Sequence, residues 1–311
     1  MLLMLLGIIY ADVLKVYRNN HNFFTADLIL INRELICTRT FEKNREKHHF
    51  NSFILGSSRS QAFKCKDWEP FIGETNKAFH FDGYGSGLYN IHNQLRYIDK
   101  LGDSIKNALI IIDRHSLTIT ENRYAHLTIS PPCLSNQSKI DYYKEVTKFQ
   151  LSNNFFREIY KNLNHLKSHS LDTTYRFVND TINCDSWYSY EQYIKADSAH
   201  YYSEKIKQNI FYERPVEKSF LCNITTEEVL LLKNIFLIFS KHNTNFKIVI
   251  SPIYNQIPLE MDQLQLLQKI FGKENIYDFS GVNKYTEPLH NYYEASHFRP
   301  HVAKSIMQEI Y

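Results

Sequence analysis

The segment with the most evident chemical potential is the run Phe53-Ile-Leu-Gly-Ser-Ser-Arg59, where an apolar stretch ends at Gly56 and two serines follow. A hydroxyl between a buried strand and a helix N-terminus lies where open α/β sheets bind ligands and where the helix favours developing negative charge. Ser57 and Ser58 are therefore candidate nucleophiles for acyl transfer. Small residues also suit any tight strand-to-helix turn, and so short a motif matches often by chance.

A glycine-rich loop follows a second apolar stretch, in Phe79-His-Phe-Asp-Gly-Tyr-Gly-Ser-Gly-Leu88. Glycines let backbone N–H groups approach a ligand closely, so the loop could supply a donor to an oxyanion. The spacing matches neither a dinucleotide-binding fingerprint nor a P-loop. A loop that merely turns tightly is the alternative interpretation.

The candidate general base is His297, with Glu294 three residues before it, because a carboxylate in that position can orient an imidazole. The spacing alone is weak evidence: four acid-x-x-His pairs occur among 33 acidic residues and 14 histidines, and about 1.5 are expected by chance. The main rival is Asp197 with His200, which lies in a less regular part of the chain.

Two further polar clusters occur in the sequence. An apolar run at 108–112 leads into Asp113-Arg-His-Ser116, which places Asp113 and His115 beside the expected carboxyl edge of a sheet. The adjacent His48 and His49 superficially resemble a metal site, but neighbouring side chains point apart, so a solvated loop is favoured.

These residues would be positioned by a parallel sheet. The segments expected as strands are 50–55, 78–81, 108–112, 246–251 and 275–279, and three of them are nearly continuous apolar runs, typical of strands buried on both faces. An amphipathic helix is expected after Gly87, a helix capped by Thr225 and Glu228 before the fourth strand, and a last helix starting near Val302. The alternation predicts a three-layer α/β domain, interrupted at about 117–221 by a helical or irregular insertion.

Composition fits an ordinary globular protein: 311 residues, 43% hydrophobic, 22% charged, with a net charge of +3 and no basic stripe. Nucleic-acid binding is therefore not expected. The five cysteines lack C-x-x-C spacing, so neither a disulfide framework nor a zinc ribbon is indicated, and mostly buried thiols are expected.

Residues 1–11 form an apolar run about half as long as the ~20 residues of a membrane-spanning helix. We interpret residues 1–45 as the stub of a truncated membrane anchor with a linker, and 46–311 as a single domain; a buried first helix is the alternative.

The order of these features resembles the SGNH (GDSL-like) hydrolase superfamily over roughly residues 50–120 and 245–311. The resemblance implies a flavodoxin-like parallel sheet with Ser58 as nucleophile and oxyanion donor, His297 as base and Glu294 in place of the usual Asp. Gly85 matches the second-block oxyanion glycine best, with Gly83 and Gly87 as alternatives. The third block departs from the family, because Asp113 to Ser116 lacks the Asn that normally completes the oxyanion hole.

The resemblance is greatest to the divergent cell-envelope branch, which includes proteins of teichoic-acid D-alanyl transfer and alginate acetylation. It implies an esterase or O-acyltransferase at the bacterial cell envelope, anchored by its N-terminus with the domain outside the cytoplasm. Expected partners are an acylated envelope polysaccharide and a membrane-bound acyl-transfer protein, with no cofactor, metal or nucleic acid. Because of the two departures, a non-catalytic polysaccharide-binding or assembly component is the alternative, and a cytosolic α/β enzyme the third interpretation.

Overall fold

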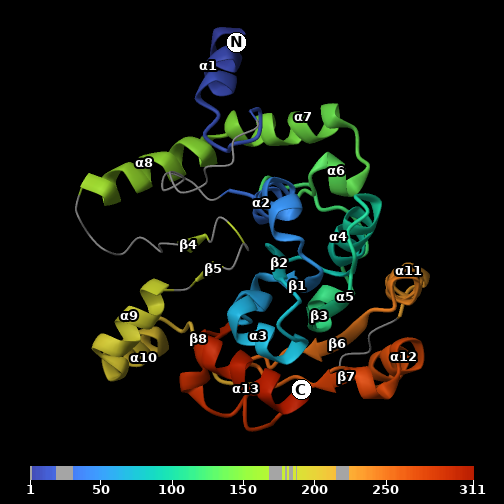
Figure 1. Ribbon diagram of the computed structural model, residues 1–311. Helices are drawn as coiled ribbons and strands as arrows, with labels where there is room; N and C mark the ends of the chain where they lie inside the picture. Colours follow the sequence, from blue (N-terminus) through green and yellow to red (C-terminus); the bar gives the residue numbers. More distant parts are fainter. Residues whose placement is uncertain are drawn as a thin grey trace.

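The computed structural model describes residues 2–18, 31–167, 177–178, 181, 185–186, 188–214 and 224–311. At its centre lies a five-stranded parallel sheet of order β2-β1-β3-β6-β7 (Figure 1). All expected strands are present, with ends shifted by at most two residues: β1 Ser52–Ser57, β2 Ala78–Gly83, β3 Asn107–Ile112, β6 Asn245–Ile250 and β7 Ile276–Asp278. This order is that of flavodoxin-like folds, and the predicted three-layer α/β class is confirmed.

Helices cover both faces of the sheet, because the strands bury side chains on both sides. Phe53 and Leu55 point into one apolar core, and Ile54 points into the other. The first core is closed by helices α2 (Arg33–His48), α4 (Leu88–Lys100), α11 (Thr226–His242) and α12 (Met261–Phe271). The second is closed by α3 (Cys65–Ile72) and α13 (Pro300–Ile310).

Local signals account for where several helices begin. Helix α11 has the expected capping box, in which the Glu228 amide donates to Thr225 Oγ1 at 3.1 Å and the Thr225 amide to Glu228 Oε2 at 2.8 Å. It ends at Asn243, whose left-handed backbone conformation closes the last turn. Helix α4 begins directly after Gly87, as expected.

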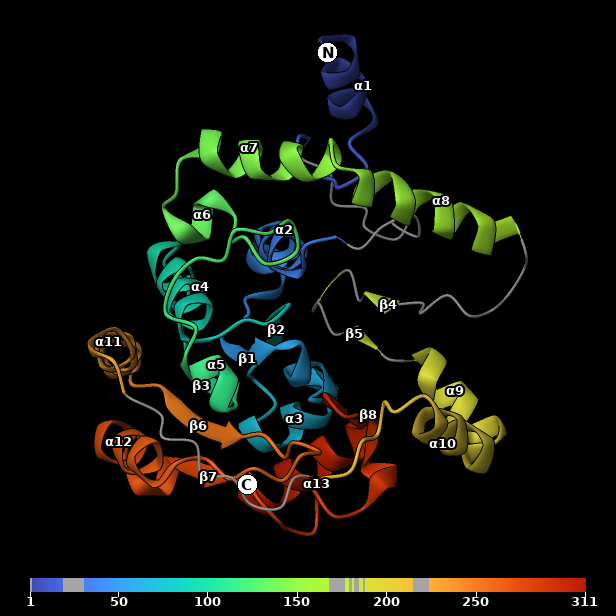
Figure 2. The ribbon, with the colours of Figure 1, turned by 180° about the vertical axis from the view of Figure 1, so that it is seen from behind.

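The described part of the segment between β3 and α11 is mainly helical, in line with the predicted helical or irregular insertion (Figures 1 and 2). Its described strands form one short antiparallel pair and take no part in the central sheet. The elements are α5 (Arg114–Leu117), α6 (Pro132–Ser135), α7 (Lys139–Gln150), α8 (Asn153–Lys167), β4 (Phe177–Val178), β5 (Asp185–Ser186), α9 (Tyr188–Ala196) and α10 (Ser198–Lys207).

The packed domain begins before residue 46, the start expected from the sequence. Helix α2 is part of the domain, because Cys37 and Phe41 lie fully buried in the first core. Phe41 makes edge contacts with Phe53, Phe79 and Phe81, so a segment interpreted as linker supplies the centre of an aromatic cluster.

Helix α1 (Leu2–Ala11) stands away from the sheet, on the side of the molecule where α7 and α8 lie (Figures 1 and 2). Leu6, Ile9 and Tyr10 are exposed, whereas Leu14 and Val16 are buried against α2, α7 and α8. Within the described part of the chain, no helix combines the length and the apolar character needed to cross a membrane.

Two of the three described thiols are buried, in line with the expectation of mostly buried thiols. Cys37 and Cys65 are buried, but Cys133 is exposed. Cys184 and Cys222 lie outside the described residues.

Candidate active site

The turn after β1 distinguishes the two serines. Ser57 is buried and caps the short 3-10 helix η1 (Ser58–Ala62), its hydroxyl accepting the Arg59 amide at 3.4 Å. Ser58 is partly exposed at the carboxyl end of β1. Gly56 lets β1 pack closely against β3 just before the turn, because a Cβ at this position would lie 2.6 Å from the Ile111 carbonyl oxygen of β3. Of the two candidates, Ser58 alone therefore presents its hydroxyl to the site.

His297 approaches Ser58 from the other end of the chain. It begins β9 (His297–Phe298), which pairs with β8 (Tyr292–Glu294) in a hairpin after β7. His297 Nε2 lies 2.9 Å from Ser58 Oγ, and Nδ1 is hydrogen bonded to Glu294 Oε1. The structure thus brings together three residues that the sequence separates by up to 239 positions.

The protonation of the triad follows from its hydrogen bonds. Burial alone would raise the pKa of Glu294, but the hydrogen bond and charge of His297 outweigh it, and the pKa is lowered. An ionised carboxylate only accepts, so His297 Nδ1 must carry a proton, and in the neutral ring Nε2 is left to accept the Ser58 O–H. The Ser296 amide donates to the other carboxylate oxygen at 2.7 Å and fixes its orientation. This is the arrangement of a nucleophile, base and orienting acid.

The rival pair has a structural explanation. Asp197 is the N-cap of α10, and its carboxylate accepts the His200 amide at 2.8 Å. Capping by itself produces an acid three residues before a helical position. His200 is exposed on that helix, and no contact joins it to Ser58 among the described residues.

The glycine loop lies beside Ser58, because β2 pairs with β1 and places Gly83 opposite Ser57. The Gly87 amide donates to Asn90 Oδ1 at 3.0 Å, so it is occupied and does not serve as an oxyanion donor. Gly85, at φ +58°, occupies the turn, and a side chain there would meet only the flexible end of Arg123. Gly85 and Gly83 remain the candidates.

The third-block position is filled by an ion pair. Asp113 is buried after β3, where its Oδ1 accepts the amides of His115 and Ser116 at 2.8 and 3.0 Å and caps α5. Its Oδ2 lies 2.7 Å from Arg59 Nη1, and Arg59 Nε donates to the Ser296 carbonyl at 3.0 Å. His115 itself is exposed.

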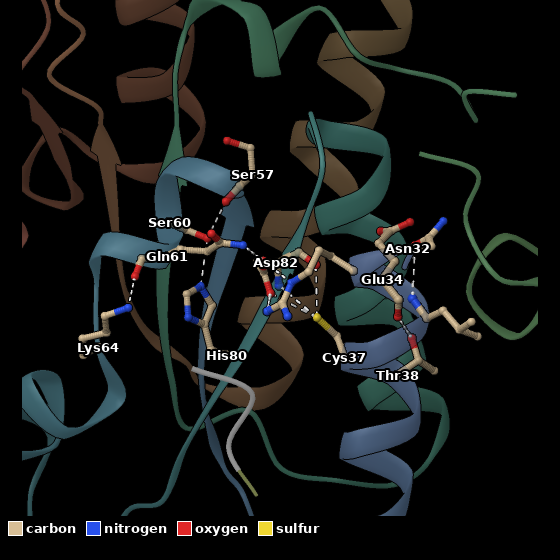
Figure 3. A network of polar contacts seen from close by, with 12 residues as sticks. Asn32, Glu34, Cys37, Thr38, Ser57, Ser60, Gln61, Lys64, His80 and Asp82 are labelled. Carbon is tan, nitrogen blue, oxygen red and sulfur yellow. Dashed lines mark hydrogen bonds and ion pairs between the residues drawn. The ribbon is translucent and has the colours of Figure 1, made fainter. Parts of the chain in front are cut away.

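A buried polar network supports η1 from beneath (Figure 3). Ser60 Oγ donates to the Ser57 carbonyl at 2.7 Å and lies 2.8 Å from His80 Nε2, and the side-chain amide of Gln61 donates to the Asp82 carboxylate. His80 and Asp82, two positions apart on β2, thus face the same helical turn. This network holds the element that carries Ser58.

Asp82 also ties β2 to α2 through a fully buried ion pair. Arg33 Nη2 and Nε lie 2.7 and 3.0 Å from its two carboxylate oxygens. Burial opposes the ionised form of Asp82, but the charge and hydrogen bonds of Arg33 outweigh it and lower the pKa. Sequence reasoning missed this pair; the signal available was a His-x-Asp alternation inside an apolar strand.

The neighbouring Glu34 supports the glycine loop. Its carboxylate accepts Asn90 and Gln94 side-chain amides at 3.0 Å each and the Ser130 hydroxyl at 2.6 Å. A Cβ at Gly83 would lie 3.0 Å from Glu34 Cγ, so the loop packs closely on this side chain. Complete burial raises the pKa of Glu34 to about 7.

The insertion contacts the hairpin that carries His297. The hydroxyls of Tyr201 and Tyr202 donate to the carbonyls of Tyr293 and Tyr292 at 2.8 and 3.0 Å. These tyrosines pack in the second core, so this part of the insertion contributes to the packing of the domain.

An ion pair reinforces this contact. Glu191 of α9 accepts two hydrogen bonds from Arg299, at 2.9 and 2.8 Å, and one from the Tyr293 hydroxyl at 2.8 Å. The insertion therefore holds residues on both sides of Glu294 and His297. No pattern in the sequence pairs these positions.

Comparisons with known proteins leave the family open. No protein-family model matches the chain, and no curated protein matches it. Membership of the SGNH superfamily therefore stays a prediction. Among the described residues, no group of three His, Cys, Asp or Glu side chains is placed to hold a metal ion.

Proposed function

We propose that this protein is an SGNH-like serine esterase or O-acyltransferase that acts on acyl esters of a bacterial envelope polysaccharide. The observation that carries the proposal is the continuous hydrogen-bonded chain Ser58–His297–Glu294 at the carboxyl edge of the parallel sheet. Ligands bind at this edge in open α/β sheets, at the point where strand order reverses. Here that point lies between β1 and β3.

The mechanism is two-step acyl transfer. His297 Nε2 takes the Ser58 proton as the alkoxide attacks the acyl carbonyl, and Glu294 stabilises the imidazolium. The N–H groups of Ser58 and Gly85 would hold the oxyanion. The intermediate collapses as His297 returns the proton to the leaving sugar oxygen, and the acyl group stays on Ser58. Water, or another sugar hydroxyl, then gives its proton to His297 and attacks the acyl-enzyme. The bond between Ser58 Oγ and the acyl carbon breaks as His297 returns that proton to Ser58, and the free acid or the acylated sugar leaves.

The test is labelling of the full chain by a fluorophosphonate, in which the Ser58 oxygen bonds to phosphorus and fluoride leaves. Ser58→Ala and His297→Ala should each lower labelling and hydrolysis of a chromogenic acetyl ester at least about 10³-fold, with non-additive losses in the double variant. Glu294→Gln should cost about ten- to a hundredfold less than either, since the acid only orients and stabilises the imidazole. His200→Ala is the matched control and should match the wild type. If the wild type is not labelled at Ser58, the non-catalytic alternative replaces this proposal.

The proposed location is the outer face of a membrane, with α1 as the point of attachment and a membrane-bound acyl-transfer protein as a partner. The support is an apolar helix that exposes Leu6, Ile9 and Tyr10 and stands away from the domain (Figure 1). Helices α7 and α8, on the same side, expose Ile140 and Phe156. Flotation with lipid vesicles should recover the full chain but not a chain with Ile9→Asp and Tyr10→Asp. Equal recovery of both would contradict attachment through α1.

A further inference from the structure

The residue after the nucleophile occupies the region where the predicted mechanism lacks a donor. Arg59 follows Ser58 directly, and its guanidinium bridges Asp113 at the third-block position and the carbonyl of Ser296. Ser296 in turn precedes His297. The Arg59–Ser296 contact of 3.0 Å therefore runs alongside the Ser58–His297 contact of 2.9 Å, joining the same two segments.

Two anchored nitrogens fix the guanidinium and leave its third nitrogen available. Nε and Nη1 are bonded, whereas Nη2 forms no hydrogen bond with the described part of the chain. The Arg59 side chain is 20% exposed and Asp113 2%, so the carboxylate that anchors the guanidinium is buried while part of the Arg59 side chain stays accessible. The positive charge of Arg59 also acts on the triad, because it contributes to lowering the pKa of Glu294.

Asp113 alone does not explain this arrangement. Its Oδ1 already caps α5, and its Oδ2 orients one nitrogen of Arg59 without occupying the rest of the fork. A planar guanidinium held at two of its nitrogens is rigid, and it presents the remaining N–H groups in fixed directions. Preorganised donors of this kind are what an oxyanion hole requires.

We propose that Arg59 is a catalytic residue that donates from Nη2 to the oxyanion of the tetrahedral intermediate, replacing the Asn missing from the third block. This inference rests on the proposed acyl-transfer function. The negative charge that forms on the carbonyl oxygen would meet the Ser58 and Gly85 amides and the Arg59 guanidinium. Asp113 would act as a positioning residue that holds the guanidinium.

The experiment compares Arg59→Ala and Arg59→Lys with the wild type, using 4-nitrophenyl acetate hydrolysis and the rate of fluorophosphonate labelling. Loss of one oxyanion donor lowers kcat by about 10²–10³, and KM should change little because the charge develops only in the transition state. Arg59→Lys should be intermediate. Added ethylguanidinium should partly restore kcat in Arg59→Ala, and affinity for a boronic acid should fall in proportion to kcat/KM across the variants.

The matched control is Arg45→Ala. Arg45 also bridges a carboxylate and a carbonyl, those of Asp103 and Leu101, at 2.7 Å each, but these precede β3 at the opposite edge of the sheet. This variant should keep the wild-type kcat. A rise in KM at unchanged kcat would assign Arg59 to binding an anionic substrate group and overturn the proposal. If wild-type Ser58 is labelled and Arg59→Ala is labelled at the same rate, the proposal for Arg59 is also overturned. If wild-type Ser58 is not labelled, both this proposal and the proposed function are overturned.

Discussion

Glu191 offers the most direct test of whether the insertion belongs to the catalytic machinery. Replacing it with Gln keeps the size of the side chain but removes the charge that receives two hydrogen bonds from Arg299 and one from Tyr293. Burial alone would raise the pKa of Glu191, but the hydrogen bonds from Arg299 and Tyr293 outweigh it, so the carboxylate is ionised at neutral pH. Glu191→Gln therefore perturbs the contact without opening a cavity.

The expected magnitude follows from these three bonds. Hydrogen bonds to charged groups contribute about 1.5–3 kcal/mol each when buried. The side chains of Glu191 and Arg299 are 23% and 16% exposed, and solvent weakens such pairs. We expect Glu191→Gln to lower the free energy of unfolding by about 2 kcal/mol in all.

The catalytic effect should exceed what stability alone explains. Tyr293 precedes Glu294 and Arg299 follows His297 by two positions, so the lost bonds loosen both ends of the hairpin. A displacement of about 1 Å in a catalytic group can cost about 10²-fold in rate. We expect kcat to fall about tenfold to a hundredfold in protein that is still fully folded, with KM nearly unchanged.

The assay combines urea unfolding with steady-state ester hydrolysis and the pH dependence of kcat. Glu204→Gln is the matched control, because Glu204 lies on the same insertion and its ion pair, among the described residues, is with the exposed Lys207. A displaced Glu294 should also change the pH dependence of kcat, because the carboxylate that orients the catalytic imidazole would have moved. If Glu191→Gln loses stability while kcat and its pH profile stay at wild-type values, the insertion only stabilises the fold, and its predicted role in positioning Glu294 and His297 is refuted.

Two further predictions concern stability. Glu34 has a folded-state pKa of about 7 against 4.5 for the ordinary group, so its contribution to stability is complete below the unfolded-state pKa and is lost as the pH rises to about 7. Urea unfolding of the wild type should show up to about 3 kcal/mol of this pH dependence, and Glu34→Gln much less. An equal pH dependence of the unfolding free energy in both proteins would contradict the raised pKa. Gly56→Ala forces a Cβ to 2.6 Å from the Ile111 carbonyl and should destabilise the fold by about 1–3 kcal/mol and slow Ser58 labelling, whereas unchanged thermal unfolding would show that β1 and β3 can separate without cost.

The sheet could be predicted from the sequence because its information is local. Strands buried on both faces need nearly continuous apolar side chains, and residues 53–55, 108–112 and 248–250 provide them. The capping box at Thr225 likewise depends on residues three apart. Such signals are short in range and have few competing interpretations.

The role of α2 was missed because its informative residues are polar. Arg33 and Glu34 are buried, and the helix has little amphipathic pattern, since charged side chains point inward to Asp82 and to the loop support around Asn90. From sequence alone, charged side chains are expected at the protein surface. Only the three-dimensional pairing reveals that they are satisfied.

Chain topology, and not a local sequence pattern, distinguishes His297 from His200. A segment after the last parallel strand must emerge at the carboxyl edge, where Ser58 lies, whereas the insertion has no such constraint. The contact of 2.9 Å between His297 and Ser58 agrees with that argument. The contacts of Tyr201 and Glu191 with the same hairpin could not be predicted in this way, because an insertion can return to any edge of the sheet.

Strand order explains how a departure at the third block is compatible with the proposed chemistry. β1 lies between β2 and β3, so groups that follow all three strands surround Ser58. In the resembled family the segment after β3 supplies an oxyanion donor directly. Here that segment supplies a carboxylate, Asp113, and the donor Arg59 comes from the β1 side and reaches across to it. An acidic residue in place of Asn would oppose the oxyanion if it stood alone, because like charges repel at close range. Paired with Arg59, Asp113 instead fixes the cation where negative charge would develop, so the two residues are best understood as one unit.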